Sequence, residues 1–346
     1  MAGATDFALD ALDAYLPSRV DGIRTLVGAE KFSGGQSNPT YLLTDRHGKR
    51  YVLRKQPSGT LLPSAHAVDR EYRVMEALEP TSVPVARMLC YCDDARVIGT
   101  PFYLMEFVEG RIFWDPALPE LDETERRALY DDMSRVVAAL HGVDYRAAGL
   151  GDYGKEGNFL ARQIGRWTKQ YLACATETIP AMDQLIRWLP AHLPADHHDR
   201  TTIFHGDLRL DNMIVHPHEP RIVALLDWEL STLGHPIADL AYHALPWRLT
   251  SEQFRGMAEK VPLPPGIPTE RAYLEAYGKR TGQEVDPALY EFCVAYSLFR
   301  LAAILQGILR RSLDGTASST RARETGLRAR AIAEEAWRQV SERGVA

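Results

Sequence analysis

Cysteine is scarce in this chain, with four among 346 residues, and none of them forms a C-x-x-C pair. This favours reduced thiols over a disulfide framework. The N-terminal stretch Met1–Leu16 is acidic and helix-like, and it lacks the basic region of a secretory signal. We therefore expect reduced thiols and a cytoplasmic location. The four residues are Cys90, Cys92, Cys174 and Cys293.

Positive charge is also in short supply. The 40 Lys and Arg residues are outnumbered by 46 Asp and Glu residues, the formal net charge is −6, and no basic run occurs. Nucleic-acid binding needs a positive field, so we expect no nucleic-acid partner. The chain has one long apolar run, Phe292–Leu309, with Arg300 at its middle and Gln306 near its end. A charge there is costly in lipid, so we expect a buried core helix and no membrane span.

Several common catalytic motifs are missing. There is no G-x-x-x-x-G-K-[ST] loop and no H-E-x-x-H helix, which excludes a Walker-type nucleotide site and a zinc-protease site. The chain does carry H-G-D-x-x-x-x-N from His205 to Asn212, directly after the apolar pair Ile203–Phe204. A second predicted strand, Ile222–Leu226, leads into Asp227. A loop of this form followed by a strand-terminal Asp is typical of phosphoryl transfer.

Each residue of this pattern has a chemical task in such a reaction. Asp207 is the candidate that orients or deprotonates an acceptor hydroxyl. Asn212 and Asp227 supply the oxygen ligands that Mg²⁺ prefers. A single Asp in a turn is usually a cap. The joint spacing, with strands on both sides, favours a catalytic site that uses ATP and Mg²⁺.

The hydrophobic pattern predicts an α+β protein with two lobes. An N-terminal nucleotide-binding lobe, residues 1–107, combines a small antiparallel sheet with one helix; a mainly helical lobe, residues 108–346, carries catalysis and acceptor binding. The predicted strands of the first lobe are 40–44, 50–54, 86–92 and 102–107, and its helix is 66–78. The predicted helices of the second are 122–141, 159–174, 182–189, 237–244, 269–281, 287–310 and 319–340.

The N-terminal lobe must supply a cation for the phosphates. Arg54 and Lys55 end the strand 50–54, and strand alternation places them on opposite faces, so only one points into the cleft. The register favours Arg54, which shares a face with Val52. Glu71 lies beside the buried face of the helix 66–78 and is the expected partner of that cation.

The nucleotide itself would contact two further segments. The small-residue loop Ser33, Gly34, Gly35, Gln36 and Ser37 is able to lay backbone N–H groups over phosphates, although a plain turn has the same composition. The segment that joins the lobes includes Glu106 and Val108, whose backbone groups are placed to pair with an adenine edge.

These residues together resemble the small-molecule kinases of the aminoglycoside phosphotransferase and choline kinase type. The resemblance covers about Phe32 to Gln306, includes the segment 234–241 in which Asp239 would brace the catalytic loop, and implies a two-lobed, protein-kinase-like fold. The segment Asn158–Trp167 resembles the branch that is fused to some acyl-CoA dehydrogenases, which implies hydroxyacyl-CoA acceptors. The short run between Asp227 and Asp239 favours a small-molecule acceptor over a protein.

The acceptor stays open on these residues. Acidic residues such as Asp152, Glu156 and Glu177 would suit a cationic antibiotic, whereas Arg162, Arg166 and Lys169 would suit a coenzyme A ester or form a solvated face. A nucleotide-binding regulatory module without catalysis is the alternative function. Retention of all three candidate catalytic and metal-binding residues counts against that alternative.

Overall fold

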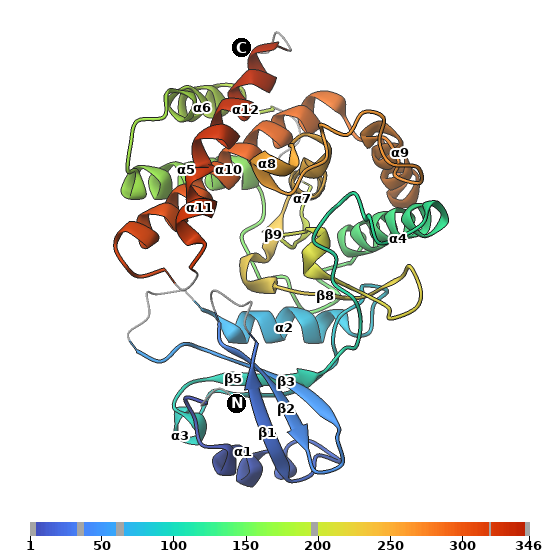
Figure 1. Cartoon of the computed structure of the whole chain (residues 1–346), viewed down its shortest axis with the longest axis vertical. Coiled ribbons are helices and arrows are strands. Elements are labelled where there is room, and N and C mark those ends of the chain that lie inside the picture. The colour runs from blue at the N-terminus through green and yellow to red at the C-terminus, as the bar shows by residue number, and fades with distance from the viewer. Residues whose placement is uncertain (1–4, 33–37, 60–65, 195–199, 318–319, 343–346) are drawn as a thin grey trace.

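The computed structural model describes residues 5–32, 38–59, 66–194, 200–317 and 320–342. Figure 1 shows the strand-rich N-terminal part, in blue, at one end of the molecule and the helices of the C-terminal part at the other. The N-terminal sheet has five antiparallel strands in the order β1-β2-β3-β5-β4. They are β1 (Leu26–Lys31), β2 (Thr40–Asp45), β3 (Arg50–Lys55), β4 (Met88–Cys92) and β5 (Phe102–Glu106).

The two faces of this sheet enter different cores. One face, with Tyr41 and Leu53, packs with the helix α1 (Leu9–Tyr15) and the short helix α3 (Ala95–Ile98). The other face, with Val52 and Tyr103, joins the core that also contains α2 and the C-terminal helices. Side chains alternate along a strand, so neighbours in β3 belong to different cores. The helix on this second face is α2 (Val68–Leu78).

The C-terminal part is built around one long helix, α10 (Pro287–Leu313), which contacts α5, α7, α11 and α12. By length and composition α10 would span a membrane, but 83% of its most apolar window is buried inside the protein, as in the core helix of a globular lobe. The other helices are α4 (Glu123–His141), α5 (Phe159–Cys174), α6 (Pro180–Ala191), α7 (Pro236–His243), α8 (Ser251–Phe254), α9 (Glu270–Thr281), α11 (Ala322–Leu327) and α12 (Ala329–Glu342).

Two short pairs of antiparallel strands position the loop 205–212, which is called the catalytic loop because it carries the predicted catalytic residue Asp207. Strand β6 (Thr202–Phe204) pairs with β9 (Thr232–Gly234), and β7 (Met213–Val215) pairs with β8 (Ile222–Leu225). The loop 205–212 connects β6 to β7, and the segment 226–231 connects β8 to β9. The two connections that carry the predicted catalytic and metal-binding residues are therefore held at both ends by the same two ladders.

Helix α2 ties the sheet to the helical part. Arg70 donates to the carbonyls of Tyr153 (2.6 Å) and Ser231 (3.5 Å), and its guanidinium lies 4.1 Å from the Tyr153 ring centroid. The Tyr153 hydroxyl in turn donates to the Arg70 carbonyl (3.2 Å). Polar bonds and a shared hydrophobic core thus fix α2 against the C-terminal part.

The predicted α+β class is confirmed, with a five-stranded antiparallel sheet followed by a mainly helical region. The division at residues 107 and 108 stays a prediction, although β5 does end at Glu106. The single helix expected over 319–340 is wrong, because the chain forms α11 and α12 there. Strands β1 and β9 were not expected, since β1 shows no clear alternation of burial and β9 has only three residues.

Candidate active site

The carboxylate of Asp207 is surrounded by donors from its own loop and from α7. Tyr242, from α7, donates to Oδ1 (2.8 Å), and Arg209 donates through Nη2 to Oδ2 (2.9 Å). Asn212 donates through Nδ2 to both the Asp207 carbonyl and Oδ2, each at 2.8 Å. Burial alone would raise the pKa of Asp207, but Arg209, Tyr242 and Arg300 outweigh it and lower the pKa. The carboxylate is therefore ionised and held in one orientation.

Asn212 and Asp227 lie at the ends of the paired strands β7 and β8. The Leu226 N–H donates to the Asn212 carbonyl (2.8 Å), which brings the residue before Asp227 directly against Asn212. Because the Asn212 amide nitrogen is engaged by Asp207, its Oδ1 is the atom left to accept or to bind a cation. Asp227 has a left-handed backbone (φ 66°) that turns the chain out of β8.

Arg54 connects the two halves of the site. Its Nε lies 2.8 Å from Glu71 Oε2 in an ion pair, and its Nη2 lies 3.2 Å from Asp227 Oδ1 and 3.6 Å from Glu229 Oε2. These carboxylates hold the pKa of Arg54 above its usual range despite burial of the guanidinium. A cation on β3 is thus joined to a helix of its own lobe and to the loop after β8.

Glu71 is buried, with 2% of its surface exposed, yet it has three partners. Besides Arg54, the Asn38 amide donates to Oε1 (2.6 Å) and the Tyr103 hydroxyl donates to Oε2 (3.1 Å). Burial raises the pKa of Glu71, and Arg54 opposes that rise. Two hydrogen bonds and the ion pair with Arg54 favour the charged carboxylate, through which Glu71 holds Arg54 in place.

Lys55 takes no part in this cluster. Its side chain is fully buried on the other face of β3, where Nζ lies 2.6 Å from Asp6 Oδ2. Of the two alternatives left open by the sequence, Arg54 therefore faces Glu71 and Asp227. Lys55, which was also named as a nucleotide contact, lies behind the sheet, because adjacent residues of a strand point to opposite faces.

Known proteins share the sequence and the fold that carry this arrangement of residues. Residues 28–292 match the phosphotransferase enzyme family. The chain belongs to that family. A crystal structure of a Ralstonia eutropha protein, named provisionally as an aminoglycoside phosphotransferase, superposes with a TM-score of 0.87, at 50% identity, over 97% of this chain and 99% of that one. The resemblance to small-molecule kinases and the two-lobed, kinase-like fold are thereby confirmed.

Two further comparisons extend this result. The mouse acyl-CoA dehydrogenase family member 10 is 48% identical over 95% of this chain, which spans 31% of that protein. The chain spans less than half the length of the curated relatives it matches. The fold extends to spectinomycin phosphotransferase, whose structure holds ADP and spectinomycin (TM-score 0.62, 12% identity, 95% of this chain and 98% of that one).

In this phosphotransferase, buried side chains hydrogen-bond the backbone of the catalytic loop. Asp239, on α7, accepts from the backbone N–H of His205 (2.6 Å) and of Gly206 (3.0 Å). The His205 ring is fully buried, and its Nδ1 accepts from the Asp207 N–H (3.2 Å). Burial lowers the pKa of His205, so the ring is neutral when it accepts this bond. Asp239 thus contacts the loop backbone, as the family resemblance implied, and His205 adds a second contact to it.

Sequence reasoning missed Arg209 and Tyr242 as donors to Asp207. Arg209 and Tyr242 line a small pocket together with aromatic and basic side chains. Arg255 pairs with Asp211 and lies 4.8 Å from the ring centroid of Trp114, which is 61% exposed. Arg209 follows Asp207 by two residues and was visible in the loop sequence, but nothing local indicated that it would fold back onto the carboxylate.

The remaining predicted contacts are placed as follows. Glu106 ends β5, and its N–H donates to the Arg87 carbonyl (3.0 Å), so the N–H is already used. Val108 is half-buried and packs against the larger core. The predicted phosphate-binding residues Ser33, Gly34, Gly35, Gln36 and Ser37 lie outside the described part of the chain.

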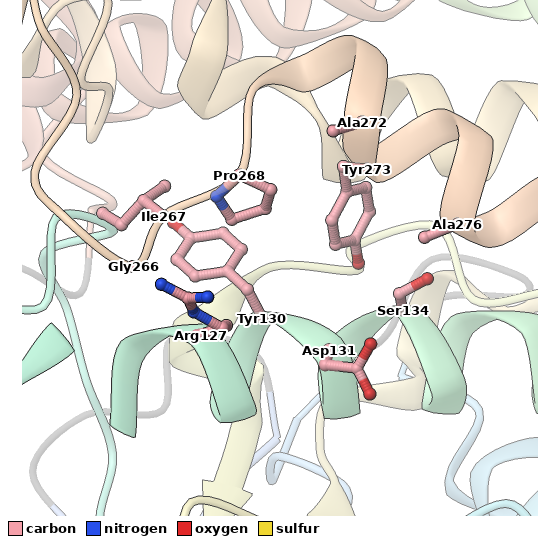
Figure 2. A pocket seen from close by; sticks show the side chains of 10 residues that line it. All are labelled: Arg127, Tyr130, Asp131, Ser134, Gly266, Ile267, Pro268, Ala272, Tyr273 and Ala276. Carbon is pink, nitrogen blue, oxygen red and sulfur yellow. The ribbon is translucent and has the colours of Figure 1, made fainter. Parts of the chain in front are cut away.

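A larger pocket lies elsewhere in the helical lobe. It has a volume of about 320 Å³ and is bounded by α4, α9 and the connector 266–268, and Tyr130 and Tyr273 are among the residues that line it (Figure 2). None of the predicted site residues lines it. The Tyr273 hydroxyl bonds His243 Nε2 (2.7 Å), and His243 Nδ1 bonds the Leu208 carbonyl (3.0 Å). The wall of this pocket therefore reaches the catalytic loop in two hydrogen bonds.

Proposed function

We propose that this protein transfers the terminal phosphoryl group of ATP, bound with Mg²⁺, to a hydroxyl group of a small molecule. The observation that carries the proposal is the chain of contacts across the two lobes. Glu71 forms an ion pair with Arg54, and Arg54 contacts Asp227. Leu226, the residue before Asp227, donates its N–H to the Asn212 carbonyl. The Asn212 side chain in turn donates to the Asp207 carboxylate. Phosphoryl transfer needs a cation for phosphates, ligands for Mg²⁺ and a carboxylate for the acceptor in this order.

In this proposal Asn212 Oδ1 and the Asp227 carboxylate hold Mg²⁺, which would neutralise charge on the phosphates. Arg54 binds the phosphates and is oriented by Glu71. Arg54 contacts both Glu71 Oε2 (2.8 Å) and Asp227 Oδ1 (3.2 Å), so it lies beside a residue that would hold the ion. The adenine edge would meet the Glu106 carbonyl and the Val108 amide, and the loop 33–37 would cover the phosphates.

The reaction forms a bond between the acceptor oxygen and the terminal phosphorus and breaks the bond to the bridging oxygen of ADP. The acceptor proton passes to Asp207. Arg209, Tyr242 and Arg300 together lower the pKa of Asp207 despite its burial, which makes it a weak base. It therefore orients the hydroxyl throughout and takes the proton late, as suits a loose transition state.

A hydroxyacyl-CoA is the acceptor that we favour. Relatives named as acyl-CoA dehydrogenase family members support an acyl-CoA connection. The pocket beside Asp207 is lined by Arg209 and Arg255 and by one carboxylate, Asp211, which pairs with both, so its lining is not the acidic one that a polycationic aminoglycoside would favour. Of the basic residues considered on α5, Arg162 donates to the carbonyls of Lys155 and Gly157, which leaves Arg166 and Lys169 exposed for an anionic coenzyme. A cytoplasmic location is part of this proposal.

Binding and turnover have to be measured separately to test this function. Titration calorimetry with Mg²⁺ and ATP is combined with an ATP-consumption assay over hydroxyacyl-CoA esters, aminoglycosides and amino alcohols. We expect binding, and turnover with one class of acceptor. Nucleotide binding without turnover across the panel would favour the non-catalytic regulatory module, and absence of nucleotide binding would refute both functions.

The variant Asp207→Asn assigns the chemistry. It keeps the size of the side chain and should leave Mg²⁺-ATP affinity within about twofold, because Arg54 and Asp227 are unchanged. Turnover should fall by about 10²–10⁴-fold, the scale of losing a group that acts on the acceptor proton. Single-turnover rates and circular dichroism check the two expectations, and a near-normal rate would refute the role of Asp207.

A further inference from the structure

Arg300 is a buried cation that the proposed mechanism does not use. It lies in the middle of the apolar helix α10 with 3% of its surface exposed. No carboxylate among the described residues forms an ion pair with it. Burying a guanidinium without a counter-charge is costly, so a buried Arg in such a helix needs a specific partner.

The partner of Arg300 is the backbone of the catalytic loop. Its Nη2 donates to the Gly206 carbonyl at 2.5 Å. The guanidinium carbon lies 4.8 Å from the ring centroid of Tyr242 and 5.3 Å from that of Trp167. Aromatic faces attract a cation at these distances. The charge is thus held between two rings and directed at the peptide that precedes Asp207.

Gly206 explains why this peptide needs an external restraint. Its φ of +87° favours glycine, and a Cβ there would lie 2.9 Å from the Leu230 carbonyl oxygen. Only glycine fits, but a glycine restricts its own backbone least of all residues. The peptide between Gly206 and Asp207 is therefore oriented by its contacts, with His205 on its N–H and Arg300 on its carbonyl.

The other backbone groups around Asp207 already have partners. The Asp207 N–H bonds His205 (3.2 Å), the Asp207 carbonyl bonds Asn212 (2.8 Å) and the Leu208 carbonyl bonds His243 (3.0 Å). The Gly206 carbonyl is paired as well, because it accepts from Arg300. Of these partners, Arg300 is the charged one, and it comes from a distant part of the chain. Buried peptide groups are almost always paired, and a charged donor makes the stronger bond.

We infer that Arg300 is a positioning residue for phosphoryl transfer, which fixes the peptide before Asp207 and balances the negative charge of that carboxylate. The inference rests on the proposed function. Arg300 also contributes, after Arg209 and Tyr242, to the lowered pKa of Asp207. Its position explains why an otherwise apolar core helix carries a charge at its centre.

Three variants test this role. Arg300→Met keeps the length and packing but removes the donor and the charge, and Arg300→Lys restores the charge without the planar fork. Arg310→Met is the matched control, because Arg310 lies on the same helix, is 49% exposed and pairs only with Asp314 among the described residues. Each variant is assayed for kcat, KM for Mg²⁺-ATP and amide hydrogen exchange in the loop 205–212.

We expect Arg300→Met to lower kcat by about 10- to 100-fold, the scale of a small misplacement of a catalytic group, with KM for Mg²⁺-ATP within about threefold. Arg300→Lys should recover part of kcat, and Arg310→Met should match the wild type. Exchange in Arg300→Met should rise at least about tenfold in 205–212 and stay unchanged in α2, since the missing bond is local to the loop.

The exchange measurement does not depend on activity. If the wild type consumes no ATP with any acceptor, the proposed function fails, while faster exchange confined to 205–212 still supports positioning. Wild-type kcat and wild-type exchange in Arg300→Met would overturn the inference, and so would a uniform rise across the C-terminal part. If Arg300→Met does not fold, Arg300→Gln replaces it, and wild-type kcat or loop exchange there would overturn the inference equally.

Discussion

Two neighbouring cations on β3 have opposite surroundings. Arg54 meets Glu71 and Asp227 on the side of the sheet that faces α2, and Lys55 meets Asp6 on the opposite side. The difference follows from strand alternation alone, so the pair forms its own internal control. Substituting each by the same residue separates a role in nucleotide binding from a role in the fold.

We expect Arg54→Met to weaken Mg²⁺-ATP binding by about tenfold or more, because a phosphate contact and the partner of Glu71 are lost together. Lys55→Met should leave nucleotide affinity within about twofold, since an apolar chain of similar length fills the same site and Asp6 is partly exposed to water. Calorimetric titration of both variants measures the contrast. Equal losses of affinity would show that the two faces of β3 do not divide the roles in this way.

Side-chain direction was readable from the sequence only where a regular element set it. The alternation of β3 predicted that Arg54 and not Lys55 would face Glu71. Arg209 and Tyr242 were missed as partners of Asp207, because their directions depend on a loop and on the packing of α7. The apolar run around Arg300 was correctly expected to form a buried core helix, but the contact of Arg300 with Gly206 spans 94 positions of the chain and leaves no local pattern.

At the scale of elements, helices with strong periodicity were predicted well and closely packed ones less so. The bounds of α5 and the start of α10 agree with the prediction. The region 319–340 divides because Gly326 of α11 packs directly on α10, where a Cβ would lie 2.6 Å from the Leu309 backbone. This close contact fixes the direction of α11 against α10. The chain then changes direction to form α12.

Two glycines in helices test this explanation. Gly165, in α5, is exposed and has no atom within 4 Å of the point that a Cβ would occupy, whereas Gly326 has no space. Gly165→Ala should raise the free energy of unfolding by about 0.5–1 kcal/mol, because alanine restricts the unfolded chain and favours the helix. Gly326→Ala should lower it by about 1–3 kcal/mol through overpacking. Urea denaturation of both variants measures the signs, and a stabilising Gly326→Ala would contradict the packing account.

For the molecule as a whole, buried histidines connect stability to pH. His243 is held between the Leu208 carbonyl and the Tyr273 hydroxyl, so Nδ1 carries the proton and Nε2 accepts. Burial lowers the pKa of this imidazole from 6.5 to about 4. The folded protein therefore keeps His243 neutral in a pH range where the unfolded chain binds a proton. The contribution of His243 to the free energy of unfolding is fully present above pH 6.5 and is lost as the pH falls from 6.5 to about 4.

The size of this loss is on the order of 3 kcal/mol, since each pKa unit is worth about 1.4 kcal/mol. Carboxylates with lowered pKa values, such as Asp239, add losses of the same sign in acid, so the wild-type slope alone does not assign the effect. His243→Asn keeps a donor for Leu208 and removes the titration, while the lost Tyr273 contact lowers stability equally at every pH. The free energy of unfolding of the two proteins should therefore converge between pH 6.5 and about 4, and parallel curves would show that His243 is not the group that titrates.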